Sequence, residues 1–158
     1  MKKTLFLVFG VIFVGLGVFI TNNGFTELQR AKQSETWPSV SGVITKSEVV
    51  VTKKKRTGKK RRRNKTSYKP KIEYSYQVEN KQYSNNQLSF SGYRSDKSGV
   101  EATVNFYPVT KVIDVFYNPT NPQESVLEKG ASKLNYVLIG AGVVFGLFGL
   151  FFCKMFFT

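Results

Sequence analysis

Two apolar segments constrain this chain more than any other feature. The first, Leu5–Ile20, holds sixteen residues without a charge, and a threonine on each side extends it to eighteen. An α-helix of that length measures about 27 Å, close to the hydrocarbon thickness of a bilayer. The second segment, Leu134–Cys153, has twenty residues and also carries no charge. We therefore expect two transmembrane helices, at 4–21 and 134–153, with the rest of the chain between them.

The first segment follows Met1-Lys2-Lys3, a start that is also typical of a secretory signal peptide. Cleavage would require small residues just after the apolar run, and Thr21–Phe25 reads TNNGF instead. An uncleaved signal anchor is therefore the preferred interpretation.

Both segments contain glycines at spacings that allow two helices to approach closely in lipid, where packing drives association. They are Gly10, Gly15 and Gly17 in the first segment and Gly142, Gly146 and Gly149 in the second. Glycine is also frequent in membrane helices in general. The pattern leaves open whether the two segments pack against each other as a hairpin.

The basic charge of the chain is concentrated in one stretch. The sequence has 24 Lys and Arg against 10 Asp and Glu, a net charge of +14, and the interval 53–65 holds ten basic residues and no acid. The remainder therefore carries only about +4. The candidate anion-binding residues are Lys53, Lys54, Lys55, Arg56, Lys59, Lys60, Arg61, Arg62, Arg63 and Lys65.

The segment between the apolar runs changes from a helical to a β pattern. Residues 22–36 are polar and include good helix formers, which predicts a juxtamembrane helix ending before Trp37-Pro38. Val43–Thr52 is rich in β-branched residues, and apolar side chains alternate along Ile72–Val78, so both are predicted strands. The basic run then becomes a long loop, 53–66, between two strands that can pair as a hairpin.

Shorter elements follow. We expect strands at 82–91, with an irregularity at Asn85-Asn86, and at 111–117 and 125–127. A short helix starting near Ser98 would carry Val100, Val104 and Tyr107 on one side. Several strands with close turns indicate a small antiparallel sandwich or barrel-like β domain, at 37–130. The predicted fold class is thus membrane α plus all-β, with two transmembrane helices flanking that domain.

The order of these residues resembles a known family. Trp37-Pro38 precedes the first strand, Ile72-Glu73-Tyr74-Ser75-Tyr76 forms the second, and Val115–Pro122 reads VFYNPTNP. This arrangement is similar to the bacterial family called domain of unknown function 3592. The resemblance implies a small β domain between membrane helices, and it implies no reaction. The basic insertion departs from the usual family pattern.

The residues available for catalysis or metal binding are few. The chain has no histidine and a single cysteine, Cys153, which excludes a Cys/His zinc site and an intramolecular disulfide. The ten acids are scattered, and no phosphate-loop sequence occurs. We expect no enzyme activity, no metal and no cofactor.

The basic run has two interpretations: a solvated excursion held open by repulsion, or a patch for a polyanion. The favoured hypothesis is a non-enzymatic, membrane-anchored binding module of the bacterial cell envelope, with anionic lipid headgroups or an envelope polymer as partner. One alternative is an accessory or immunity-type inhibitor of another envelope protein. A further alternative is a nucleic-acid tether, which requires the domain to face the cytoplasm.

The orientation rests on a weak charge signal. Lys2 and Lys3 precede the first helix and Lys154 follows the second, while Arg30, Lys32, Lys129 and Lys133 lie on the other side. These short flanks are nearly balanced under the positive-inside rule. The expected arrangement is a multi-pass protein of the cytoplasmic membrane with both termini inside and the β domain outside.

Overall fold

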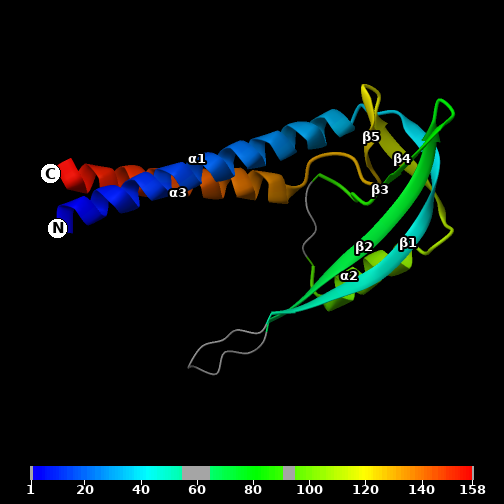
Figure 1. Cartoon of the computed structure of the whole chain (residues 1–158), viewed down its shortest axis with the longest axis horizontal. Coiled ribbons are helices and arrows are strands. Elements are labelled where there is room, and N and C mark those ends of the chain that lie inside the picture. The colour runs from blue at the N-terminus through cyan, green and yellow to red at the C-terminus, as the bar shows by residue number, and fades with distance from the viewer. Residues whose placement is uncertain (1, 55–64, 91–94, 158) are drawn as a thin grey trace. The chain divides into compact units, whose positions relative to one another are not determined.

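The computed structural model of the chain describes residues 2–54, 65–90 and 95–157. Figure 1 shows its elements, which divide into a helical unit made by the two long helices and a sheet unit spanning Ser34–Lys129. In chain order they are α1 (Lys2–Ser34), β1 (Ser39–Lys54), β2 (Lys65–Val78), β3 (Lys81–Asn85), α2 (Lys97–Phe106), β4 (Val112–Asn118), β5 (Asn121–Val126) and α3 (Lys133–Phe157). The predicted fold class is confirmed.

The helical unit is an antiparallel pair. A Cβ atom added at Gly17 would lie 2.5 Å from the backbone nitrogen of Gly146 and 2.8 Å from the carbonyl oxygen of Gly142. Gly10 lies beside Cys153 in the same way. Lower numbers on α1 therefore meet higher numbers on α3, and the two helices form the hairpin that the glycine spacing left open. Both contain stretches long and apolar enough to cross a membrane.

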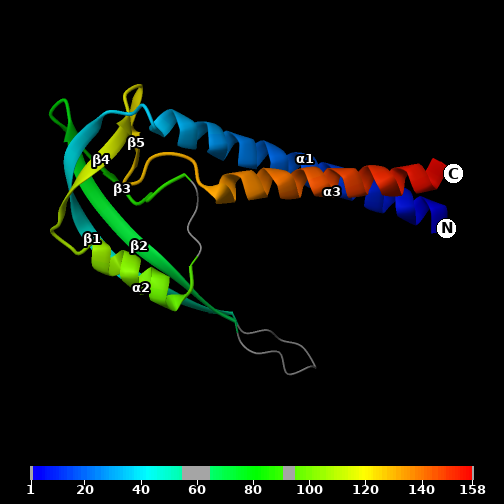
Figure 2. The same ribbon diagram turned by 180° about the vertical axis from the view of Figure 1, so that it is seen from behind.

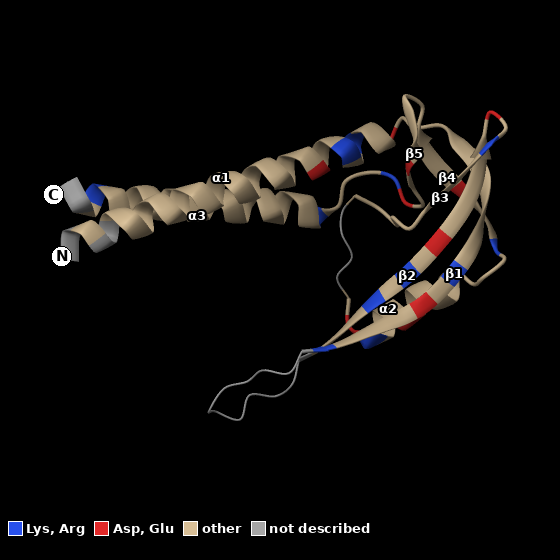
Figure 3. Ribbon diagram, viewed as in Figure 1, with Lys and Arg blue, Asp and Glu red and all other residues tan. Residues whose placement is uncertain are grey.

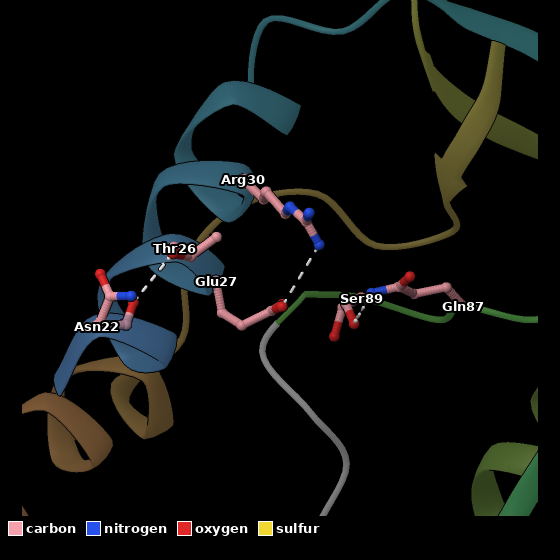
Figure 4. Close-up of polar contacts among 6 residues, drawn as sticks. All are labelled: Asn22, Thr26, Glu27, Arg30, Gln87 and Ser89. Atoms are coloured by element: carbon pink, nitrogen blue, oxygen red, sulfur yellow. Dashed lines mark hydrogen bonds and ion pairs between the residues drawn. The ribbon is translucent and has the colours of Figure 1, made fainter. Parts of the chain in front are cut away.

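The polar end of α1 continues the apolar part without a break. Local contacts support it: the Thr26 hydroxyl donates to the carbonyl oxygen of Asn22 at 3.0 Å, and Arg30 pairs with Glu27 at 3.6 Å (Figure 4). Ion pairs between residues three apart, such as Glu27–Arg30, stabilise exposed helix turns. The segment predicted as a juxtamembrane helix is thus the last part of α1, which ends at Ser34.

The sheet has the strand order β3-β2-β1-β4-β5, and all neighbouring strands are antiparallel. It is strongly curved, as Figures 1 and 2 show from opposite sides. The segment after β3 is hydrogen-bonded to the segment after β5. The Leu127 amide donates to the carbonyl oxygen of Leu88 at 3.0 Å. The β domain is therefore a single open sheet with a barrel-like curl.

One face of the sheet carries the core. Its buried members are Ile44, Ile72, Tyr74, Tyr76, Val78, Tyr107, Val115 and Leu127. The Tyr74 hydroxyl donates to the carbonyl oxygen of Gln87 at 3.0 Å and lies 3.1 Å from the Ser125 hydroxyl oxygen. Burial raises the pKa of Tyr74, so its hydroxyl stays protonated as a donor. Trp37 is also buried, with its ring edge-on to Phe90.

The short helix α2 packs on this core face. Asp96 is its N-cap and accepts a hydrogen bond from the Gly99 amide at 3.1 Å, which lowers the pKa of the Asp96 carboxyl group. Val100 is fully buried and Val104 packs against the core cluster. The helix predicted near Ser98 is therefore confirmed.

Two predicted strands have different bounds in the structure. β3 ends at Asn85, because the Asn85 side chain accepts from the amide of Asn86 at 2.7 Å and turns the chain. Beyond that turn, Gln87 bonds to the carbonyl oxygen of Ser89 (Figure 4). β5 begins at Asn121, earlier than predicted, since the turn after β4 is tight enough for Asn118 and Asn121 to pair.

The glycine contacts of α1 lead to a test with a matched control. Gly17→Ala should lower the stability of the helix pair by about 1–3 kcal/mol, because the added methyl group would clash with the α3 backbone. Gly15→Ala should leave stability unchanged or slightly raised, since a Cβ at Gly15 meets nothing within 4 Å. Unfolding by SDS in mild detergent, followed by far-UV circular dichroism, measures both. Equal effects of the two variants would contradict the described packing.

Candidate functional site: a basic two-stranded ribbon

Strands β1 and β2 extend past the rest of the sheet. On β1, the last residue paired with β4 is Val43, and on β2 the last residue paired with β3 is Tyr74. Beyond these points the two strands pair only with each other, as far as the described strands go. We call residues 46–54 of β1 with residues 65–73 of β2 the ribbon. The hairpin predicted around the basic run is confirmed.

The end of the ribbon carries the first and last residues of the predicted anion-binding set. Lys53 and Lys54 end β1, Lys65 begins β2, and Lys54 lies directly opposite Lys65. Like charges facing each other across a strand pair are destabilising, so an anion near this end would relieve repulsion. The other predicted residues, Lys55, Arg56, Lys59, Lys60, Arg61, Arg62 and Arg63, lie outside the described residues.

The outer face of the ribbon, opposite the core face, holds alternating charges (Figure 3). Lys46 lies opposite Glu73 and Glu48 opposite Lys71. Ion pairs also run along each strand, Lys46–Glu48 at 3.1 Å and Lys71–Glu73 at 3.0 Å. The bond between Lys71 and Glu73 raises the pKa of Lys71 and lowers that of Glu73. All four side chains are solvent-accessible, so the network adds little stability.

This arrangement leaves the ribbon with an excess of positive charge. Its two acids, Glu48 and Glu73, are both in contact with lysines. The remaining charged residues of the ribbon are the three lysines at its end and Lys69. The network therefore neutralises the base of the ribbon, and the positive charge increases toward its end.

The middle part of the inner face of the ribbon is apolar. Val49 lies opposite Pro70 and Val51 opposite Tyr68, and Val51 is 48% exposed. Helix α2 covers the base of this face, where the Ser47 hydroxyl donates to the carbonyl oxygen of Val104 at 3.1 Å. Beyond α2, the ribbon therefore presents apolar side chains next to its basic end.

A second candidate is a small polar cavity of about 260 Å³ lined by Thr45, Glu73, Ser84, Asn85 and Asn86. Its one carboxylate is the ion-paired Glu73, whose lowered pKa disfavours proton uptake near neutral pH. Within the described parts of the chain, no three His, Cys, Asp or Glu side chains gather in a way that could hold a metal ion.

A small antiparallel β domain between two helices of membrane-spanning length is the class of protein that these observations define. Residues 40–132, more than half of the chain, match the family model for domain of unknown function 3592 (DUF3592), and the chain belongs to that family. The resemblance stated from the sequence is confirmed. No curated protein matches the chain.

Sequence reasoning missed one feature of the ribbon, the extra residue Thr45. The register shifts between Ile44 and Lys46, so that Thr45 has no partner on β2. Such a bulge increases the local twist and redirects the strand beyond it. No glycine or proline marks the position, so the sequence carried no signal of the bulge.

The facing lysines predict a stabilising substitution. Lys65→Glu should raise the stability of the sheet unit by about 0.2–1 kcal/mol at low salt, because an opposite-charge pair replaces a like-charge pair with Lys54. The control is Lys69→Glu, which lies opposite the uncharged Val50. Thermal unfolding of the full chain in detergent, followed by Trp37 fluorescence, measures both. A stabilisation by Lys69→Glu as large as that by Lys65→Glu would contradict the register.

Proposed function

We propose that the chain is a non-enzymatic, membrane-anchored binding module of the bacterial cell envelope. In this proposal the basic end of the ribbon binds an anionic partner, either lipid headgroups or an envelope polymer. The observation that carries the proposal is the placement of Lys53, Lys54 and Lys65 together at the end of a paired two-stranded extension.

Backbone pairing supports this function because it limits the conformational entropy that is lost on binding. Lys54 and Lys65 belong to paired strands, so the base of the basic run is held in one place before any ligand arrives. A preorganised site loses less entropy on binding than a free chain would. Each basic residue near an anionic membrane surface contributes about 1 kcal/mol, so ten of them provide salt-sensitive binding.

The helical unit supports membrane anchoring. Its two helices are antiparallel and each is long and apolar enough to cross a bilayer. Two such crossings would place Lys2 and Lys154 on one side and the sheet unit on the other. In the proposed orientation the sheet unit faces away from the cytoplasm, and the membrane is the bacterial cytoplasmic membrane.

The absence of enzyme activity is also part of the proposal. The chain has no histidine, and the described tyrosines with raised pKa values are buried structural donors. Glu73 is ion-paired and has a lowered pKa, opposite to the shift that a general acid needs at neutral pH.

The first test removes the seven basic residues within 55–64 and keeps the strands, with Lys53, Lys54 and Lys65. Because Lys54 pairs with Lys65, replacing residues 55–64 by Asn-Gly should close the hairpin with a two-residue turn and preserve stability. Binding to soluble polyphosphate, or to anionic vesicles, should weaken about tenfold or more. The full chain is held in zwitterionic nanodiscs, and in the parent binding should fall between about 50 and 300 mM salt.

The control for this test is the double variant Lys81→Gln and Lys97→Gln, which removes charge at the start of β3 and α2. It should bind as the parent does. The polyphosphate and vesicle arms separate a polymer from lipid headgroups as the source of the anion. Binding by the shortened variant with the parent's affinity and salt dependence would refute the proposed site.

The second test concerns the orientation. In a Cys153→Ala background, Ala102→Cys places a thiol on an exposed helical position of the sheet unit. An impermeant maleimide should label it in intact spheroplasts. The control Lys154→Cys lies beyond the apolar stretch of α3 and should be labelled only after lysis. The reverse pattern would place the sheet unit in the cytoplasm.

A further inference from the structure

The edge of β1 that faces away from β2 is occupied over only part of its length. The Ile44 amide donates to the carbonyl oxygen of Lys111 at 3.0 Å, and the Thr110 amide donates to the carbonyl oxygen of Ile44 at 2.9 Å. The backbone groups of Ile44 therefore point away from β2. Beyond Ile44, no described strand continues along this edge.

The register identifies the backbone groups that line the uncovered edge. Ile44 lies opposite Tyr74, and the two residues form a non-hydrogen-bonded pair of the antiparallel ladder. In such a pair the backbone N–H and C=O groups of both residues point away from the partner strand, so those of Tyr74 point away from β1. Along β2 the same orientation recurs at every second residue. The β1 partners of those positions are Ser47, Val49, Val51 and Lys53. Their N–H and C=O groups consequently point outward from the ribbon.

The two edges of the ribbon differ because only the β2 edge contains a proline. On β2, Pro70 occupies an outward-pointing position, opposite Val49, and it has no N–H to donate. Proline on an exposed edge is a common way to prevent pairing with another chain. No proline occurs between Lys46 and Lys54, so the β1 edge keeps its full set of donors.

We propose that the β1 edge, residues 47–53, binds an extended acidic segment of another polypeptide by strand addition. Backbone hydrogen bonds supply the pairing, as in other β-augmented complexes. The half-buried Val49 and the exposed Val51 accept apolar side chains at alternate positions of the added strand. Lys46 and Lys54, on the opposite face of β1, favour acidic residues at the other positions of the added strand. Only this charge preference rests on the proposed function; the pairing rests on the β1 backbone.

A second copy of the chain meets like charges when the two β1 edges pair over the full length of residues 46–54. Antiparallel pairing of two β1 edges centred on Val50 would bring Lys54 of each copy opposite Lys46 of the other. Like charges directly opposite each other are destabilising. Acidic residues of an added strand would instead form opposite-charge pairs with Lys46 and Lys54.

The test uses a matched pair of proline variants at directly opposed positions. Val51→Pro removes an outward N–H from the β1 edge, and Tyr68→Pro removes one from the β2 edge of the same ribbon. The probe is a fluorescent eleven-residue peptide of alternating Glu and Val. Fluorescence anisotropy with the full chain in zwitterionic nanodiscs should show binding about tenfold weaker for Val51→Pro and unchanged for Tyr68→Pro.

Two further probes make the result independent of how the variants fold. The same peptide with N-methyl groups on alternate amides cannot pair as a strand, and it should not bind the parent chain. A Lys/Val peptide should bind weakly. Equal binding of the N-methylated peptide, no binding of the Glu/Val peptide, or equal affinities of the two folded proline variants would overturn strand addition.

The outcomes also separate this inference from the proposed function. The variant shortened at 55–64 should bind polyphosphate about tenfold or more weakly and still bind the Glu/Val peptide through the retained edge. Val51→Pro should weaken binding of the Glu/Val peptide and leave polyphosphate binding unchanged. Peptide-dependent association of two copies of the chain would indicate an edge-to-edge dimer and contradict an acidic partner.

Discussion

The antiparallel pairing of β1 with β2 is the interaction on which the sheet unit depends. It runs from Gly42 opposite Tyr76 to Lys54 opposite Lys65. The first part places Ile44 and Tyr74 in the core, where burial of apolar surface supplies most of the stability. The second part has no neighbouring strand among those described, and it carries basic charge outward from the core. One continuous ladder therefore produces both the stable domain and the proposed binding surface.

The helical unit is stabilised by different physics. The close backbone approach that glycine permits joins α1 and α3, and in a bilayer it would replace the hydrophobic driving force that lipid does not offer. The contacts of Gly17 with Gly142 and Gly146 make the two helices one structural unit. In the proposed function, this pair keeps the sheet unit near a membrane surface, where a basic ribbon meets anionic groups at high local concentration.

Much of this architecture could be predicted from the sequence because the signals were local. Charge-free runs predicted the helices, and the alternation through Ile72, Tyr74 and Tyr76 predicted a half-buried strand. The end of β3 at Asn85 depends on a side-chain hydrogen bond, and the bulge at Thr45 depends on pairing between strands. The uncovered β1 edge depends on where β4 stops. The bulge and the uncovered edge arise from tertiary pairing, which no local pattern encodes, whereas the turn at Asn85 is local and was signalled by the Asn85-Asn86 pair.

The most direct test of this account is amide hydrogen exchange of the full chain in nanodiscs, resolved residue by residue along the ribbon. The register predicts slow exchange at Glu48, Val50 and Thr52, whose amides point toward β2, and fast exchange at Val49 and Val51, whose amides point outward. Uniformly fast exchange would show that the ribbon does not form a stable ladder. Slow exchange at Val49 and Val51 would show that the β1 edge is already covered, and either result would contradict the account.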